Sequence, residues 1–489
     1  MIHLAPIDQL LIVVYLAAVV AIGVFAGRGR AHGNAVEFLL AGRSLTTPVF
    51  VMTLVSTWYG GILGVGEFSY RYGLSNWVIQ GIPYYLFSAI FAFLLARRIR
   101  ASNLITIPDK LEQAYGKPAA LLGAFLTFLL MTPAPYVLML AVLLQMVTGW
   151  SLLVCLLTGT AAATGYLVIS GFRSDVQTDV FEFFLMFLGF AVILPYAYAR
   201  FGGMEFLEAS LPPLHLTWHG GNSMQFIAVW FLIALWTLVD PSFHQRCYAA
   251  SSGRVARNGI LISIGFWFIF DAMTAFAGLY ARAALPSIEQ PMMAYPLLAE
   301  RVLPAGVKGL FYIGMLATIM STLNTLTFVS GTTLGRDLLG RLWRGRRRGG
   351  LAATLHTGVE THGPPMDKDT QLTRWGLLVS ALFSVVLALL VPSVIKLWYT
   401  IGTVLVPGLL VPLVTSYFDR LRVSGHYALS AMLAAWLTSL AWLGAGWTQE
   451  LGATDRYPFG IEPMLPGLAV SLIVWGAGWM SRRCGERAS

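Results

Sequence analysis

The sequence predicts an all-α protein that crosses a membrane about thirteen times and contains two inverted repeats of five helices each. Three observations support this fold class. The 489-residue chain is 57% hydrophobic and only 11% charged, whereas an ordinary soluble domain is about 25% charged. Apolar runs of roughly 20 residues recur from end to end. Two of these runs are interrupted by helix-breaking residues, five spans apart.

The apolar runs place the membrane-spanning helices along the whole chain. We expect spans at residues 6–27, 46–70, 75–97, 118–147, 150–172, 176–200, 223–243, 256–285, 307–337, 372–392, 396–418, 426–447 and 463–481. Residues 46–200 would form the first repeat and residues 223–418 the second. The helix at 6–27 and the two helices within 426–481 would be peripheral. Residues 1–489 would therefore be one transmembrane domain.

The basic residues indicate how the chain is oriented. With the N-terminus outside and the C-terminus in the cytoplasm, 25 of the 32 Lys and Arg residues fall on the cytoplasmic side and 7 on the other. This asymmetry follows the positive-inside rule. It places a basic loop at residues 338–371 in the cytoplasm, including Arg341, Arg344, Arg346, Arg347 and Arg348. The net charge of +9 is thus a topology signal in a multi-pass protein of the cell (inner) membrane. We expect no nucleic-acid partner.

Several motifs of enzymes do not occur in the sequence. There is no GxxxxGK[ST] phosphate loop, no HExxH and no paired CxxC, and the eight histidines are scattered. The sequence therefore predicts neither an enzyme nor a built-in ATPase. Transporters, channels, sensors and scaffolds remain, and polar residues inside the membrane must decide between them.

The ninth span carries an unusual stripe of hydroxyl groups. Its side chains Thr318, Ser321, Thr322 and Thr325 follow the spacing i, i+3, i+4 and i+7, which places them on one helical face. Hard cations such as Na⁺ bind several oxygen ligands at short range. The alternative is structural, because Ser and Thr in such helices also bond back to their own backbone or pack as small residues.

Breaks in the second and seventh spans would free backbone oxygens. The stretch "STWYGGILGVGEFSYRYG" begins at Ser56, and Gly60, Gly61, Gly64 and Gly66 crowd the middle of an apolar segment. The stretch "LWTLVDPSFHQR" contains Asp240–Pro241, and proline kinks a helix. Irregular backbone inside a membrane occurs where it lines a cavity or is buried in protein. The glycines could instead allow close helix packing.

Several longer motifs resemble the sodium:solute symporter family, which includes sodium-coupled sugar, proline and sialic acid transporters. They are "LAGRSLTTPVF", "TIPDKLEQAYG", "SGFRSDVQTDVFEFFLMFLG", "HQRCYAASSGRVARNG" and "GLFYIGMLATIMSTLNTLTFVSGTTLGRDLL", together with the glycine-rich stretch. The resemblance runs from about Leu40 to Asp337. It implies a LeuT-like fold with five-plus-five inverted repeats and Na⁺ as the coupling ion.

The resemblance also implies candidate sodium ligands. Ser56, Tyr59 and Thr318 would bind the main sodium ion through their carbonyls, and Ser321 and Thr322 through their side chains. A possible second sodium site would use Asp179 with Ser321, Asn324 and Thr325. Asp179 could instead line the ion exit path or be a charge at a helix end.

The solute site should lie between the two broken helices. Its candidate residues are Trp58, Ile62, Leu63, Trp236, Asp240, Trp267 and Asp271. Sugar and proline transporters of the family differ at several of these positions, so neither substrate carries over. An aromatic pocket with two aspartates would suit a solute that has apolar area plus an amine or hydroxyls. Thr274 could simply satisfy Asp271, and the tryptophans could be core residues. Glu67 and Arg71 could pair as an external gate, or be solvated helix-end charges.

The prediction for function is sodium-coupled import of a small organic solute by alternating access. The expected partners are this solute and the lipid bilayer, with no obligate protein partner. One alternative is a solute sensor of the same fold that acts through a separate partner. Another is proton coupling through Asp179, Asp240 or Asp271.

Overall fold

The structure is a computed structural model that describes residues 3–26, 35–344, 368–446 and 457–488. Most of the predicted basic loop, including Arg346, Arg347 and Arg348, lies outside the described residues. The described chain is helical apart from short connections and one isolated bridge between Leu45 and Ala250. The all-α prediction is confirmed.

Within the described residues, twelve helices are long and apolar enough to span a membrane, and a bent pair makes a thirteenth span, as predicted. The first six spans are α1 (Pro6–Ala26), the bent pair α3 (Thr47–Trp58) and α4 (Ile62–Tyr72), a segment containing α5 (Ile82–Phe91) and α6 (Arg97–Ala101), α8 (Lys117–Leu130) with α9 (Ala134–Thr148), α10 (Leu152–Ser170) and α11 (Phe172–Phe201). The others are α13 (Met224–Ile233) with α14 (Trp236–Val239) and α15 (Pro241–Ala249), α16 (Gly253–Ala284), α18 (Val307–Thr332), α20 (Lys368–Leu390), α21 (Val394–Ser416), α22 (Gly425–Ala445) and α23 (Met464–Ala488).

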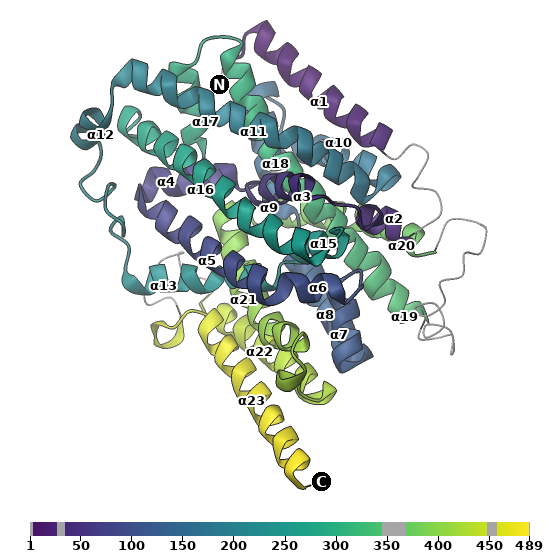
Figure 1. The fold of residues 1–489 in the computed structure, drawn as a ribbon. Coiled ribbons are helices and arrows are strands. Elements are labelled where there is room, and N and C mark those ends of the chain that lie inside the picture. The colour runs from purple at the N-terminus through teal and green to yellow at the C-terminus, as the bar shows by residue number, and fades with distance from the viewer. Residues whose placement is uncertain (1–2, 27–34, 345–367, 447–456, 489) are drawn as a thin grey trace.

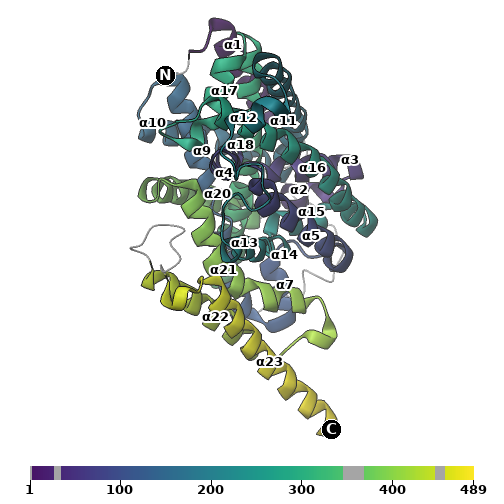
Figure 2. The ribbon, with the colours of Figure 1, turned by 90° about the vertical axis from the view of Figure 1, so that its left-hand side faces the viewer.

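Shorter helices connect the spans at their ends. They are α2 (Ala35–Leu40), α7 (Ile107–Tyr115), α12 (Met204–Ser210), α17 (Ala294–Val302) and α19 (Gly340–Arg344). In Figures 1 and 2, α1 lies at one edge of the bundle, and α22 and α23 lie side by side at the opposite edge. The remaining helices pack between these two edges.

Helix α18 forms the centre of the bundle. Its spanning window is 100% buried inside the protein, compared with 22% for α1 and 22% for α23. It packs against α11, α3 and α20. At its N-terminus, the carboxylate of Asp8 on α1 accepts hydrogen bonds from the backbone N–H groups of Gly306 and Gly309, both at 2.7 Å. This cap holds the outer helix α1 onto the central one.

The predicted break in the second span lies between Trp58 and Ile62, where α3 and α4 meet at an angle of 58°. Two glycines allow this break to approach its neighbours. A Cβ atom on Gly60 would overlap the side chain of Thr322, and one on Gly61 would overlap the ring of Trp398. The glycines therefore bring the broken backbone against α18 and α21.

The seventh span is also broken, as its Asp–Pro pair predicted. Helix α14 ends at Val239, and Pro241 is the first residue of α15. Asp240 between them is extended, and one of its carboxylate oxygens caps α15 by accepting a hydrogen bond from the Ser242 N–H at 2.7 Å. Because proline has no N–H to donate, the first position of a helix suits it.

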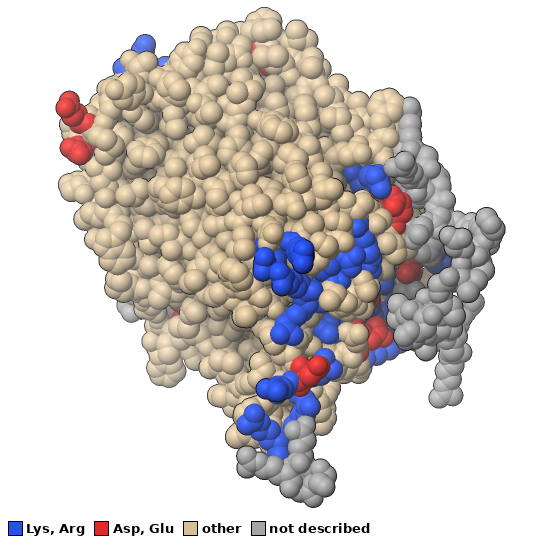
Figure 3. All heavy atoms as spheres, viewed as in Figure 1, with Lys and Arg blue, Asp and Glu red and all other residues tan. Residues whose placement is uncertain are grey.

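A network of ion pairs lies at the far end of α18. Arg341 pairs with Asp109 on α7 and, at 2.7 Å, with Asp337. Burial alone would raise the pKa of Asp109, but Arg336 and Arg341 outweigh this effect and lower it to about 2. These pairs explain why helical structure continues through Leu339 and α19, past the predicted start of the loop at residue 338. Figure 3 shows Lys and Arg gathered at this end of the molecule, over α6 and α7, whereas most of the visible face is uncharged.

Candidate functional site

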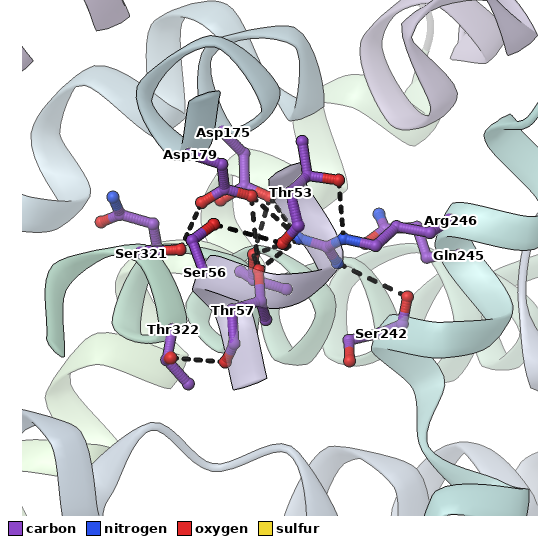
Figure 4. Close-up of polar contacts among 12 residues, drawn as sticks. Thr53, Ser56, Thr57, Asp175, Asp179, Ser242, Gln245, Arg246, Ser321 and Thr322 are labelled. Atoms are coloured by element: carbon purple, nitrogen blue, oxygen red, sulfur yellow. Dashed lines mark hydrogen bonds and ion pairs between the residues drawn. The ribbon is translucent and has the colours of Figure 1, made fainter. Parts of the chain in front are cut away.

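Polar side chains from four helices meet in the interior of the bundle. The end of α3 contributes Ser56 and Thr57, α11 contributes Asp179, α15 contributes Arg246 and α18 contributes its hydroxyl stripe (Figure 4). All of these side chains are buried. Such a concentration of oxygens at the end of a broken helix is the arrangement that ion-binding sites in membrane proteins use.

The predicted main sodium ligands lie where α3 ends against α18. The hydroxyl of Thr322 donates to the backbone carbonyl of Thr57 at 2.5 Å and to that of Thr318 at 3.4 Å. The last four carbonyls of α3, which include that of Ser56, have no partner within the helix. The structure thus brings the free end of α3 to the side chain of Thr322 (Figure 4).

The other stripe residues have different contacts. The hydroxyl of Thr318 donates to the carbonyl of Met315 at 2.7 Å. This side chain therefore bonds back to its own helix, and only the backbone carbonyl of Thr318 is left as an ion ligand. The hydroxyl of Ser321 donates to the carboxylate of Asp179 at 2.5 Å. Ser321 therefore links α18 to the carboxylate of Asp179 on α11.

Arg246 is a functional residue that the sequence analysis missed. Its side chain is 0% exposed, and its guanidinium lies 2.9 Å from the Asp179 carboxylate and 3.8 Å from that of Asp175. It also donates hydrogen bonds to three hydroxyls, those of Thr53 at 3.2 Å, Thr57 at 2.5 Å and Thr325 at 3.0 Å. The guanidinium thus occupies the space beside Asp179 (Figure 4).

Two signals in the sequence could have revealed the ion pair between Arg246 and Asp179. Asp175, Asp179 and Glu182 follow the spacing i, i+4 and i+7 on α11, which places three carboxylates on one helical face. Arg246 lies six residues after the predicted break at Asp240. Charges inside a membrane pair with one another, so an arginine partner for this face could have been expected.

The two other residues of the possible second sodium site point in different directions. Thr325 donates to the Asp175 carboxylate at 2.8 Å, next to Asp179. Asn324 instead donates to the hydroxyl of Tyr166 on α10 at 2.5 Å. The structure therefore gathers Asp179, Ser321 and Thr325 around Arg246, while Asn324 is turned to another helix.

A cavity of about 130 Å³ lies next to these polar residues, between the two broken spans. At about 30 Å³ for each water, this space holds about four waters or one small organic molecule. Its aromatic lining consists of Trp58, Tyr59, Tyr84, Tyr136, Trp230, Trp236 and Trp398. The rest consists of Thr57, Gly61, Val65, Gln80, Met131, Ile233, Asp240, Ser242, Asp271, Thr322 and Leu326.

The cavity contains four of the seven predicted solute residues. Trp58, Trp236, Asp240 and Asp271 line it. The three others do not and are 0% exposed, namely Ile62, Leu63 and Trp267. Trp267 packs behind Trp58 with their ring centroids 5.6 Å apart, so it supports the wall of the cavity. The first turn of α4 buries Ile62 and Leu63 in the apolar core.

The carboxylate of Asp271 is hydrogen-bonded to Tyr85 and not to Thr274, the partner that the sequence suggested. The hydroxyl of Thr274 donates to the backbone carbonyl of Asp271 at 3.1 Å and leaves the carboxylate untouched. The hydroxyl of Tyr85 donates to that carboxylate. Tyr85 in turn accepts a hydrogen bond from the indole N–H of Trp77 at 3.0 Å. Asp271 is thus held at the wall of the cavity by a chain of donors.

Glu67 and Arg71 do form the expected ion pair, at 3.0 Å. Both belong to α4, with 16% and 48% of their side chains exposed. A pair within one exposed helix contributes about 0.3–0.5 kcal/mol. Because it does not connect two elements, it is a local surface contact in this structure.

Two broken helices, a central cavity and adjacent free carbonyls define a secondary transporter of the inverted-repeat class. The family profile described as "Sodium:solute symporter family" matches residues 38–351. The chain belongs to this family and is a sodium-coupled symporter, not an enzyme, as the motifs predicted.

The relatives agree with this assignment over nearly the whole chain. A sodium/pantothenate symporter of Escherichia coli (strain K12) is 26% identical over 96% of this chain and 95% of its own length. A sodium/proline symporter of Staphylococcus aureus (strain JH9) is 24% identical over 95% of this chain and 91% of its own. The identity is too low to transfer a solute.

The solved structures show the same fold. A substrate-bound, outward-open Na⁺-coupled sialic acid symporter superposes with a TM-score of 0.75, covering 98% of both chains at 15% identity. This similarity confirms the LeuT-like five-plus-five fold.

Proposed function

We propose that this protein imports a small organic solute with Na⁺ bound between the end of α3 and the middle of α18. The ligands are the carbonyls of Ser56, Tyr59 and Thr318 and the side chains of Ser321 and Thr322, which we call the main ion site. The observation that carries the proposal is the contact between the Thr322 hydroxyl and the free C-terminal end of α3, at the Thr57 carbonyl. In the ion-bound state, the Thr322 hydroxyl leaves the Thr57 carbonyl and binds Na⁺ together with the carbonyls on either side of it, those of Ser56 and Tyr59.

The main ion site and the solute cavity share a wall. Thr57, Tyr59 and Thr322 line the cavity, and Tyr59 and Thr322 are also proposed ion ligands. An ion that fixes the end of α3 against α18 therefore fixes the wall that the solute contacts. Each ligand then stabilises the state that binds the other, which is the thermodynamic requirement for coupling.

The proposed orientation has the N-terminus outside and the C-terminus in the cytoplasm of the cell. The gathering of Lys and Arg over α6 and α7 supports it (Figure 3), because basic residues concentrate on the cytoplasmic side. The ion-pair network of Arg336, Arg341 and Asp109 then lies at the cytoplasmic end of α18.

A second sodium ion at Asp179, Asn324 and Thr325 remains a proposal with one condition. In the present structure, the Arg246 guanidinium balances the charge of Asp179 from 2.9 Å. A second Na⁺ can bind there only if this guanidinium moves away from the carboxylate, because two cations would otherwise share it. The main ion site requires no such movement.

The thermal stability of the purified protein tests the main ion site. Na⁺ is titrated at constant ionic strength against wild type, Ser321→Ala/Thr322→Ala and the control Thr327→Val. Thr327 lies on the same helix, and its hydroxyl bonds to its own helix at Leu323. Ligands of the folded state raise its stability by mass action. We expect a Na⁺-specific rise in wild type and the control that the double variant loses.

The same experiment separates proton coupling from sodium coupling. The buried carboxylates of Asp175 and Asp179 share the guanidinium of Arg246. The buried carboxylate of Glu182 accepts a hydrogen bond from the hydroxyl of Tyr15. These buried carboxylates give proton binding a place in the structure. If stability and transport respond to pH but are identical in Na⁺, K⁺ and choline, the proposed ion site is wrong.

A further inference from the structure

The charged side chains that line the solute cavity are all acidic. Its lining includes the carboxylates of Asp240 and Asp271, and no Lys, Arg or His is among the described residues that form it. The nearby cation Arg246 is engaged with the carboxylate of Asp179 and with the hydroxyls of Thr53, Thr57 and Thr325. An anionic solute would therefore meet two carboxylates and no side-chain cation in this cavity.

Asp240 presents one oxygen to the cavity that nothing in the described structure uses. All three of its hydrogen bonds, from the Ser242 N–H, the Ser242 hydroxyl and the Phe243 N–H, fall on Oδ1. The other oxygen, Oδ2, has none. The N-terminus of α15 supplies the equivalent of about half a positive charge to this carboxylate. A carboxylate inside a membrane is paired with an opposite charge. A positively charged group on the solute would supply the rest of this charge.

The aromatic lining suits a positively charged group. The rings of Trp58 and Tyr84 form a T-shaped pair with their centroids 4.8 Å apart, and the ring centroids of Tyr136 and Trp398 are 6.2 Å apart. Ring faces attract ammonium groups within about 6 Å, and aromatic cages bind quaternary ammonium ions. The rings thus add to the attraction that Asp240 exerts.

Three indole groups define a second feature of the solute. The N–H groups of Trp230, Trp236 and Trp398 are buried without an acceptor in the described structure, and all three side chains line the cavity. A buried donor without a partner costs free energy. A hydroxyl, ether or carbonyl oxygen on the solute would satisfy them.

We propose that the transported solute is an organic amine or quaternary ammonium compound with a hydroxyl or carbonyl oxygen. Its ammonium group binds Asp240 Oδ2 among the rings of Trp58 and Tyr84, and its oxygen accepts from one of these three indole N–H groups. This inference rests on the proposed function of the cavity as the solute site.

The test compares ligand binding to the purified full-length protein in saturating Na⁺. The probes are choline and 2-phenylethylamine as cations, proline as a zwitterion, and pantothenate as an anion. The variant Asp240→Asn keeps the helix cap, since Asn caps as well as Asp, but removes the charge. The control Asp419→Asn removes a charge from an exposed residue outside the cavity, whose side chain is 89% exposed.

We expect at least one of the two cations to raise the melting temperature or to show a binding isotherm, with pantothenate inactive. Asp240→Asn should weaken the binding of that cation by about 30-fold or more, while Asp419→Asn binds like wild type. Binding of pantothenate without either cation, binding of none of the four probes, or equal cation binding by Asp240→Asn would overturn the proposal. The Na⁺ response without solute is measured first on each variant, so a failure of the ion site is recognised separately.

Discussion

Arg246 carries a positive charge into the interior of the protein, where its side chain is 0% exposed. It is retained there because the carboxylates of Asp179 and Asp175 and three threonine hydroxyls surround it. Two charges removed from water require such complete partnering to offset their desolvation. At the residue scale, the polar interior is therefore a network of paired charges as well as a set of ion ligands.

Removing the charge of Arg246 should unbalance this arrangement. We expect Arg246→Gln to lower the free energy of unfolding by about 3–5 kcal/mol, because Asp179 is left buried without its cation. Adding Asp179→Asn should recover part of the loss. Urea or thermal unfolding of the two single variants and the double variant measures the coupling. Strictly additive losses would show that the pair does not interact.

Glu462 provides a pH-dependent prediction outside the membrane spans. Burial raises its pKa from 4.5 to about 7. Stability that depends on the neutral form is complete below about pH 4.5 and is lost as the pH rises through about 7. We therefore expect Glu462→Gln to melt above wild type at pH 8 but not at pH 4.5. The exposed Glu208→Gln serves as the control. A gain that is independent of pH would contradict this account.

The hydroxyl stripe and the two aspartates of the cavity could be predicted because spacing and intramembrane position are visible in the sequence. The direction of each side chain could not. Thr318 bonds to its own helix while Thr322 reaches α3, although both lie on the same predicted face. Arg246 was missed because its partners are far away in the sequence, on α11 and α3.

At the scale of elements, the break between α3 and α4 positions both the ion site and the cavity. Its glycines predicted the interruption, and the Asp–Pro pair predicted the one before α15. The 58° bend and the contacts of the broken backbone with α18 and α21 could not be predicted, because they depend on tertiary packing. The extension of the ninth span to α19 was also missed, since its ion pairs are with α7.

Gly60 should be intolerant of a side chain for this reason. A Cβ atom would overlap Thr322 and approach Tyr136 to 2.8 Å. We expect Gly60→Ala to destabilise the protein by about 1–3 kcal/mol through overpacking and to weaken its response to Na⁺. The control is Gly165→Ala on α10, where no atom lies within 4 Å of the added Cβ. Titrations of melting temperature against Na⁺ compare the two. An unchanged response of the melting temperature to Na⁺ in Gly60→Ala would show that the helix break does not position the ion site.

At the scale of the whole molecule, the fold buries α18 at the centre and leaves α1, α22 and α23 at the edges (Figures 1 and 2). The number of spans and the repeat architecture could be predicted from apolar runs and paired breaks. The charge distribution then sets the orientation of the bundle in the membrane, which is the remaining expectation at this scale.

The native cysteines allow a direct test of orientation. Cys484 on α23 is exposed, whereas Cys155 and Cys247 are buried. We expect a membrane-impermeant maleimide to leave Cys484 unmodified in intact cells and to modify it after permeabilisation. The control variant Ser287→Cys places a thiol at an exposed position in the connection after α16, on the expected outer side, and should react in intact cells. The reverse labelling pattern would invert the proposed topology.

The central claim is that Na⁺ binds where α3 ends against Thr322, and binding of ²²Na⁺ to the purified protein tests it most directly. The account predicts saturable binding that unlabelled Na⁺ displaces and K⁺ does not. This binding should be retained in Thr327→Val and lost in Thr322→Ala. Undiminished binding in Thr322→Ala, with that variant folded, would contradict the account and place the coupling ion elsewhere.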